Sequence, residues 1–274
     1  MNLDVTGGTL AYEVSGSGPL VVLAHGLGDS RQAYRFVIPA LVEAGYRVAA
    51  VDLRGCGESS AGWDGYTRTD IAQDLIALIN QLGGPAVLVG HSIAGGAATI
   101  AAAREPTLVT SVVEIAPFTR VQQIHLADLR ITRVRRGTLH LLGAGFFGSR
   151  RQWRRYLEVA YPGPKPADWD ARLAHIDAML REPGRMKALQ KMVQSKPSDA
   201  GAQLPNVRCP ILVIEGSLDP DWASPEAEGR AIVAALPAGQ GRLEVIPDAG
   251  HYPHTQFPQQ VIALMRSFLT EVHA

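Results

Sequence analysis

The sequence predicts an α/β fold with a mostly parallel central sheet, and three observations support that prediction. Short apolar runs of strand length alternate with helical stretches up to Pro117, as in strand–helix–strand units. Residues 118–202 then show helical stretches and loops but no strand pattern. The alternation resumes at Cys209, so the core is expected to comprise residues 1–117 and 203–274, with residues 118–202 inserted between them.

The N-terminal region is expected to form a hairpin followed by a helix. Residues 8–14 alternate in polarity, residues 15–19 form a turn cluster, and residues 20–24 form a second, more buried strand. Ser30 is expected to cap the next helix, whose apolar positions have helical spacing, and Gly45 to end it.

The remaining elements follow from the same periodicities. Residues 69–82 carry apolar side chains on one helical stripe, which predicts an amphipathic helix. Pro258 is expected to begin the C-terminal helix, because proline suits the first helical position. The other expected elements are strands at 46–51, 108–115, 209–215 and 242–246 and a helix at 225–236.

The chain is organised around a sharp turn at Ser92. An apolar strand at 85–89 leads into Gly90-His91-Ser92-Ile93-Ala94, and an Ala-rich helix follows at 97–104. A strand that turns abruptly into a helix lifts the serine hydroxyl off the sheet and points the first helical amides toward its target. The stretch nearly matches the G-x-S-x-G pattern, with Ala94 in place of the last glycine. The alternative is a buried strand and helix with an incidental serine.

A serine nucleophile needs a base and an acid, and both are found after later strands. Asp219 follows the strand at 209–215, and His251 follows the strand at 242–246. The carboxyl ends of parallel strands share one edge of a sheet, where ligands bind. Ser92, Asp219 and His251 are therefore expected at one edge, together with the turn at residues 25–28.

With these residues in place, the chain resembles the α/β-hydrolase superfamily over essentially its whole length. The resemblance implies helices on both faces of the sheet and a helical lid at residues 118–202. The motifs that carry it are His25-Gly26 after a strand, Asp52-x-Arg54-Gly55-x-Gly57-x-Ser59, the turn around Ser92, Gly216-x-x-Asp219, and Gly250-His251 before the last helix.

The same resemblance implies the roles of the site residues. Ser92 would be the nucleophile, His251 the base and Asp219 the acid that orients the base. The backbone N–H groups of Leu27 and Ile93 would form the oxyanion hole. Chemistry of this kind requires no cofactor and no metal ion.

Two other acids compete with Asp219 for the orienting role. Asp221 lies two residues away, and Glu114 follows the preceding strand, where some members of the superfamily place the acid. Asp219 is favoured because it has the Gly-x-x-Asp spacing. Glu114 sits inside an apolar run and fits a paired structural carboxylate better. Asp52 and Arg54 are expected to stabilise a loop.

Other histidines lie near the predicted site. His25 and His91 fit packing or hydrogen-bonding roles better than catalytic ones. His251 and His254 with Asp248 form only a weak metal signal, because a third clear ligand is missing. The substrate pocket is expected to be lined by His25, Gly26, His91, Phe118 and Trp222.

Composition restricts the partners. The 274 residues carry no net formal charge, so no global charge argues for a nucleic acid or membrane partner. Two distant cysteines, Cys56 and Cys209, fit a reducing compartment, and the N-terminus shows no signal peptide, so a cytoplasmic location is expected. The uncharged stretch 83–103 is interpreted as a buried strand, turn and helix, with no transmembrane segment. The oligomeric state stays open, a homodimer included.

The insertion is basic. Residues 118–165 contain ten Arg or Lys and two acids, a surplus of eight, so the rest of the chain is acidic by the same amount. A solvated helical face that pairs with the acidic core is the main interpretation. Attraction of anionic substrates or anionic lipid is the alternative.

The expected function is hydrolysis of a carboxylic ester or lactone of a small, fairly apolar molecule. Ser92 argues against the epoxide-hydrolase and dehalogenase branches, which use an aspartate nucleophile. Carbon–carbon bond hydrolase, amidase, thioesterase and perhydrolase activities stay open, as do a non-catalytic receptor and an interaction module. No complete dinucleotide fingerprint and no phosphate loop occur.

Overall fold

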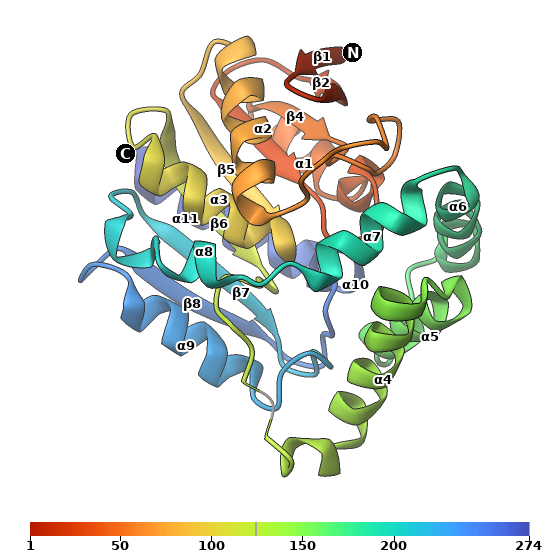
Figure 1. The fold of residues 1–274 in the computed structure, drawn as a ribbon. Coiled ribbons are helices and arrows are strands. Elements are labelled where there is room, and N and C mark those ends of the chain that lie inside the picture. The colour runs from red at the N-terminus through yellow and green to blue at the C-terminus, as the bar shows by residue number, and fades with distance from the viewer. Residues whose placement is uncertain (124, 274) are drawn as a thin grey trace.

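The computed structural model describes residues 1–123 and 125–273, which form an eight-stranded sheet surrounded by helices (Figure 1). Ile124 and Ala274, inside the predicted insertion and core, lie outside the described residues. The predicted α/β fold is confirmed. The strands are β1 (Asn2–Val5), β2 (Gly8–Ser15), β3 (Leu20–Ala24), β4 (Arg47–Val51), β5 (Ala86–His91), β6 (Val109–Ile115), β7 (Ile211–Gly216) and β8 (Gly241–Ile246).

The strand order is β1-β2-β4-β3-β5-β6-β7-β8. β2 pairs antiparallel with β1 and β4, and every pair from β4 to β8 is parallel. The carboxyl ends of the parallel strands therefore share one edge. The loops after β3, β5, β7 and β8 bring Leu27, Ser92, Asp219 and His251 to that edge.

Alternate side chains of the central strands enter two separate cores. In β3, Val22 packs into one core, whereas Val21 and Leu23 pack into the other. Strands buried on both faces need helices on both faces, which explains their continuous apolar sequences. One face is covered by α2 (Arg68–Gln81), α3 (Ile93–Arg104) and α9 (Pro225–Ala235), and the other by η1 (Arg31–Tyr34), α1 (Ile38–Glu43) and α11 (Pro258–His273).

The predicted N-terminal hairpin is wrong. β2 pairs with β1 and β4, and β3 lies between β4 and β5. The polar alternation of β2 suits an antiparallel strand near the edge of the sheet. The uniformly buried β3 suits its interior. The strand β1, which has only four residues, was not predicted.

The helix predicted after β3 is split. A 3₁₀ turn, η1, precedes a short helix, α1, which begins at Ile38. Pro39 lies in the first turn of α1, the part of a helix that tolerates a residue without an amide hydrogen. Ser30 does not cap either element through its side chain; its hydroxyl accepts a hydrogen bond from Arg172 at 3.0 Å.

The described part of residues 118–202 contains helices and loops but no strand. Its main helices stand beside the sheet in Figure 1 and share an aromatic core that includes Trp153 and Tyr156. Two of its arginines pair with core acids, Arg120 with Glu228 at 3.0 Å and Arg172 with Asp29. The elements are η2 (Asp128–Arg130), α4 (Thr132–Phe147), α5 (Arg150–Ala160), α6 (Trp169–Arg181), α7 (Arg185–Gln194) and α8 (Ser198–Gly201), and the core adds η3 (Leu204–Asn206) and α10 (Pro253–Gln256).

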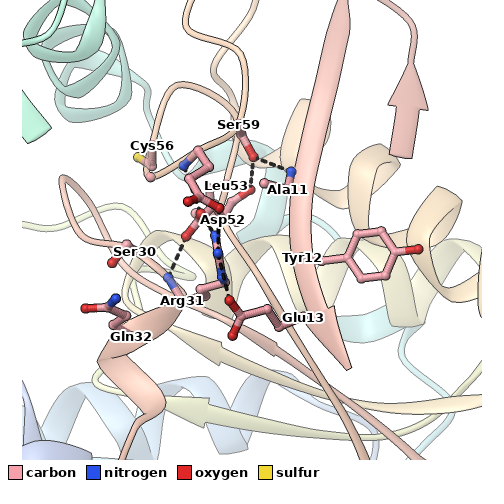
Figure 2. Close-up of polar contacts among 12 residues, drawn as sticks. Ala11, Tyr12, Glu13, Ser30, Arg31, Gln32, Asp52, Leu53, Cys56 and Ser59 are labelled. Atoms are coloured by element: carbon pink, nitrogen blue, oxygen red, sulfur yellow. Dashed lines mark hydrogen bonds and ion pairs between the residues drawn. The ribbon is translucent and has the colours of Figure 1, made fainter. Parts of the chain in front are cut away.

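Asp52 organises the loop after β4 (Figure 2). Its carboxylate accepts hydrogen bonds from the backbone N–H of Arg31 at 2.7 Å and of Glu58 at 2.9 Å, and it pairs with the Arg31 side chain. A Cβ at Gly57 would lie 2.1 Å from the Asp52 carboxyl carbon, so glycine is required there. Ser59 donates to the Asp52 carbonyl at 2.6 Å. These contacts match the predicted loop-stabilising role of Asp52.

Glu215, in β7, is an unpaired acid in the core. It is fully buried, and neither carboxyl oxygen forms a hydrogen bond within the described chain. Burial, reinforced by nearby carboxylates, raises the pKa of Glu215 well above its ordinary value. Burial therefore favours the neutral form of this side chain in the folded protein.

Glu215→Gln is expected to make stability less dependent on pH. A raised folded-state pKa stabilises the fold at low pH, and that contribution is lost as the pH rises above the unfolded-state pKa of about 4.3. Between the unfolded-state and folded-state pKa values, each pH unit lowers the free energy of unfolding by up to about 1.4 kcal/mol. The free energy of unfolding, measured with urea at pH 5 and 7, should therefore decrease less between these two pH values for Glu215→Gln than for wild type. The exposed control Glu43→Gln should behave as wild type; equal decreases in all three proteins would contradict the prediction.

Candidate functional site

Ser92 occupies a strained turn between β5 and α3. Its backbone has φ 56° and ψ −118°, a region that residues with a side chain rarely adopt. The turn brings strand and helix together so closely that a Cβ at Gly90 would lie 2.2 Å from the carbonyl oxygen of Ala94. Ala94, the residue that departs from the glycine pattern, is fully buried in α3. The sharp strand-to-helix turn predicted from the sequence is present in this structure.

Two backbone amides flank the serine. Leu27, in the loop after β3, and Ile93, the first residue of α3, line the same cavity as Ser92. Neither N–H donates a hydrogen bond to another residue of the described chain. A Cβ at Gly26 would lie 3.0 Å from the Ser92 Cβ, so glycine lets this loop approach the serine. Both amides are thus available to a negatively charged oxygen near Ser92.

His251 contacts two acids. Its Nδ1 lies 2.7 Å from Oδ2 of Asp219 and 3.3 Å from Oδ2 of Asp221. Asp221 also accepts a hydrogen bond from the Tyr156 hydroxyl at 2.6 Å, and its backbone N–H donates to Oδ1 of Asp219 at 2.9 Å. All of these groups are buried. Asp219 therefore makes the direct contact with the imidazole, and Asp221 forms a second acidic neighbour.

The serine and the histidine are not hydrogen-bonded to each other in this structure. Oγ of Ser92 is enclosed and has no hydrogen-bond partner among the residues described. Catalytic hydrogen bonds are often long without substrate and shorten in the substrate complex. The structure thus brings the predicted nucleophile, base and acid to one site, and their roles stay predictions.

The acids determine the protonation of His251. Burial by itself lowers the pKa of this imidazole, but the charges of Asp219 and then Asp221 outweigh it and raise the pKa to about 8. Burial raises the pKa of Asp221 to about 7, against the opposing effect of His251. This value for His251 is higher than the range of 6–7 expected from the ordinary behaviour of histidine.

The pH profile of turnover should report this environment. A base must be neutral, so the rate is expected to rise with pH through a midpoint near 8. Asp221→Asn removes one negative neighbour of the imidazole and should move the midpoint to lower pH. Steady-state kinetics between pH 5 and 10 would measure both profiles. An unchanged midpoint in Asp221→Asn would show that the charge of Asp221 does not reach His251.

The histidines near the site other than His251 are packed into the protein. Nε2 of His25 accepts a hydrogen bond from the Leu53 amide at 3.0 Å. His91 lies 2.8 Å from the carbonyl oxygen of His251, and burial lowers the pKa of both His25 and His91. These contacts match the packing and hydrogen-bonding roles predicted for the two residues. His254 is fully buried and stacks on Tyr34.

A cavity of about 240 Å³ lies beside Ser92. This volume is below the range of about 300–1,000 Å³ typical of drug-sized ligand pockets, which favours a small substrate. Its walls are mostly apolar, and the helices of the insertion supply Leu141, Phe146 and Met192. The lining therefore combines the serine and its flanking amides with side chains far away in the sequence.

Of the five residues predicted to line the pocket, Phe118 lies in this cavity. Gly26, His25 and His91 are absent from its lining. The two imidazoles make the packing contacts above, and a Cβ at Gly26 would lie 2.6 Å from Nδ1 of His91. Trp222 packs on Phe118, with ring centroids 5.2 Å apart, and faces a neighbouring cavity.

Residues of the insertion bind the loops that carry Asp219 and His251. Arg133 in α4 donates hydrogen bonds to the carbonyl oxygens of Asp219 at 3.3 Å and Ala223 at 2.8 Å. The His251 amide donates to the Ala160 carbonyl of α5 at 2.9 Å. Sequence analysis missed Arg133 and Tyr156 because no local pattern distinguishes them from the other basic and aromatic residues of the insertion.

Asp219, Asp221 and His251 also form the group of potential metal ligands in the described chain, with ligand atoms within 4.8 Å of one another. His254 and Asp248, considered with His251 from the sequence, do not belong to it. Asp248 is exposed and His254 is buried elsewhere, so that arrangement is not formed.

The described helices include no candidate membrane span. Within residues 1–123 and 125–273, no helix has both the length and the apolar composition needed to cross a bilayer. The uncharged stretch at 83–103 folds into β5, the turn at Ser92 and most of α3, as predicted.

Comparisons with known proteins agree with this architecture. A family model described as the alpha/beta hydrolase family matches residues 21–264. A 2-(acetamidomethylene)succinate hydrolase from Mesorhizobium japonicum is 27% identical over 281 residues, covering 97% of this chain and 94% of that protein. A malate-bound esterase from Thermogutta terrifontis is 27% identical with a TM-score of 0.75 and full coverage (100%) of both chains.

A further solved structure shares the fold alone. The enol-lactonase from Burkholderia xenovorans has a TM-score of 0.78 at 22% identity and covers 98% of this chain and 100% of its own.

Proposed function

Because this chain belongs to the alpha/beta hydrolase family, we propose that it is a serine hydrolase that cleaves a carboxylic ester or lactone of a small, mostly apolar molecule. The observation that carries the proposal is the strained turn at Ser92, which faces a small cavity together with two unbonded backbone amides. The pair formed by His251 and Asp219, with 2.7 Å between Nδ1 and Oδ2, supplies a base and its orienting acid.

The proposed reaction begins when His251 takes the proton from Oγ of Ser92, whose oxygen attacks the substrate carbonyl carbon. The amides of Leu27 and Ile93 donate to the resulting oxyanion, and each such donor is worth roughly 3 kcal/mol. The bond to the leaving oxygen then breaks, and the protonated His251 returns the proton to that oxygen. An acyl group remains bound to Ser92.

The second half of the reaction repeats these steps with water. His251 removes a proton from the water molecule, and the hydroxide attacks the acyl carbon. The bond to Oγ breaks, Ser92 regains its proton from His251, and a carboxylic acid leaves. Asp219 keeps the imidazole in the tautomer that presents Nε2 to the serine and stabilises the imidazolium.

The helices between Phe118 and Ala202 are proposed to act as a lid. Leu141, Phe146 and Met192 form part of the cavity wall, so movement of these helices would change access to Ser92. Enclosure by such a lid would exclude water and strengthen the interactions of the oxyanion.

The bond proposed to be cleaved is that of an ester or lactone. Similar proteins are described as a 2-(acetamidomethylene)succinate hydrolase and an esterase, so related chains differ in their substrates. The same three residues would also serve an amidase, a thioesterase or a carbon–carbon bond hydrolase. Ester or lactone hydrolysis is preferred because the cavity is small and mostly apolar, and because the mechanism needs no group beyond Ser92, His251, Asp219 and the two backbone amides.

A panel of 4-nitrophenyl esters from acetyl to decanoyl would test the proposal. We expect turnover with a preference for short acyl chains, because the cavity is only about 240 Å³. A fluorophosphonate probe should label Ser92, as identified by mass spectrometry of the labelled peptide. Absence of both hydrolysis and labelling would reject the serine-hydrolase proposal in favour of a non-catalytic receptor. Labelling without ester hydrolysis would shift the substrate to another acyl class.

A further inference from the structure

Arg68 is a buried cation in the wall of the cavity that contains Ser92. It is the first residue of α2 and only 4% exposed. Its Nε donates a hydrogen bond to the Phe118 carbonyl at 2.7 Å. Its Nη1 donates to the carbonyl and hydroxyl oxygens of Ser195 at 3.2 and 3.1 Å. These bonds fix the plane of the guanidinium group.

Arg68 differs from the other buried arginines of the described chain because it has no ion pair. Arg54 pairs with Asp74 at 2.8 Å, Arg172 with Asp29, and Arg185 with Glu182 at 3.3 Å. A buried charge without a partner is costly, so proteins normally pair such groups. Arg68 is therefore an exception among the buried arginines of the described chain.

Asp199, whose charge acts on Arg68, already accepts hydrogen bonds from other groups. Oδ2 of Asp199 accepts hydrogen bonds from the backbone N–H and hydroxyl of Thr69 at 3.1 and 3.0 Å, and Oδ1 accepts from the Ala200 amide at 2.9 Å. Burial lowers the pKa of Arg68 to about 10, with partial compensation by the charge of Asp199. The guanidinium nevertheless remains charged at neutral pH.

One nitrogen of Arg68 is free to bind a ligand. Three of the five N–H groups of the guanidinium donate to Phe118 and Ser195. Nη2, which carries the other two, has no hydrogen bond within the described residues and is not among the fully enclosed polar atoms without a partner. It therefore keeps accessible surface in a side chain that lines the cavity.

We propose that Nη2 of Arg68 binds a carboxylate of the substrate, so that the natural substrate is an ester or lactone that also carries a free carboxylate group. This inference rests on the proposed function of the same cavity. The only other cation in the lining, within the described chain, is the exposed Lys196, and the only acid is Asp221, which contacts Tyr156 and His251. A substrate carboxylate would supply the missing counterion and would be held by charge-assisted hydrogen bonds.

A purely structural role for Arg68 makes a different prediction. Phe118 and Ser195 lie near the two ends of the insertion, so Arg68 could serve only to fix those ends. In that case its replacement would weaken hydrolysis of charged and uncharged substrates to the same extent. Substrate binding by Arg68 would affect charged substrates selectively.

The test compares mono-4-nitrophenyl glutarate, which has a free carboxylate, with its methyl ester, which does not. Wild type should prefer the charged substrate by at least tenfold in kcat/KM. In Arg68→Gln the ratio of the two kcat/KM values should fall by about 10–100-fold, mainly through KM, because a charged hydrogen bond is lost. Arg68→Lys should restore part of the ratio. The exposed control Arg135→Gln should leave the ratio within twofold of wild type.

Binding to Ser92→Ala separates this inference from the proposed reaction. Calorimetry should show that glutarate binds to Ser92→Ala and that Arg68→Gln in the same background weakens binding at least tenfold. Binding that depends on Arg68 without turnover of any ester would reject the proposed reaction but retain the carboxylate site. Ester hydrolysis with no preference for the charged substrate, or with a ratio unchanged in Arg68→Gln, would overturn the carboxylate site and leave the serine hydrolase.

Discussion

Ser92→Ala is expected to lower kcat for ester hydrolysis by about 10⁴–10⁶-fold, the scale seen when a serine nucleophile is removed from a triad. Among the described residues, only Ser92 places its hydroxyl in the strained turn beside the Leu27 and Ile93 amides. Because Oγ has no hydrogen-bond partner among the described residues, its removal should cost little stability. The rate would be measured with the best ester of the panel, and the melting temperature would be compared with that of wild type.

Ser111→Ala is the matched control for this variant. Ser111, in β6, is also fully buried, and its hydroxyl likewise has no partner within the described residues. Removal of this hydroxyl should leave kcat within threefold of wild type. Retention of ester turnover by Ser92→Ala would rule out Ser92 as the nucleophile. A comparable loss of kcat in both variants would indicate that removal of any buried hydroxyl lowers activity.

Asp219→Asn is expected to lower kcat by about 10³–10⁴-fold, by analogy with the orienting acid of serine proteases. The neutral amide can donate a hydrogen bond to Nδ1, which favours the tautomer with its proton on Nε2, and it does not stabilise the imidazolium as a carboxylate does. Asp219 makes the direct contact at 2.7 Å, whereas Asp221 lies 3.3 Å from the same nitrogen. Asp221→Asn should therefore cost tenfold or less.

Glu114 is the third candidate for the acid that orients His251. It is buried in β6 and accepts hydrogen bonds from Thr99 and Thr119, and within the described residues it forms no hydrogen bond or ion pair with His251. Glu114→Gln should leave the pH midpoint of turnover unchanged. If Asp221→Asn proved more damaging than Asp219→Asn, the two acids would exchange roles. If Glu114→Gln were the most damaging, the acid would belong to the preceding strand.

Most of the core architecture could be predicted because its signals are local. The strands from β3 to β7 are short, mostly apolar runs, and the turn at Ser92 follows from a strand, a small-residue cluster and a helix in succession. Asp219 and His251 could be selected because each follows a strand whose carboxyl end lies at the same edge of a parallel sheet. The pairing of β2 with β4, in contrast, could not be predicted from local signals. It depends on which strands occupy the interior of the sheet and which lie near its edge.

The sequence by itself determined the α/β fold, the turn that presents Ser92 and the loops that carry an acid and a histidine. The tertiary structure alone decided what surrounds these groups: the second acid beside His251, the contact between Tyr156 and Asp221, and the unpaired Arg68 in the cavity wall. These features depend on contacts between segments tens to more than one hundred residues apart. Whether a charged group is buried and paired depends on how the whole chain packs. It therefore cannot be predicted from the spacing of residues in the sequence.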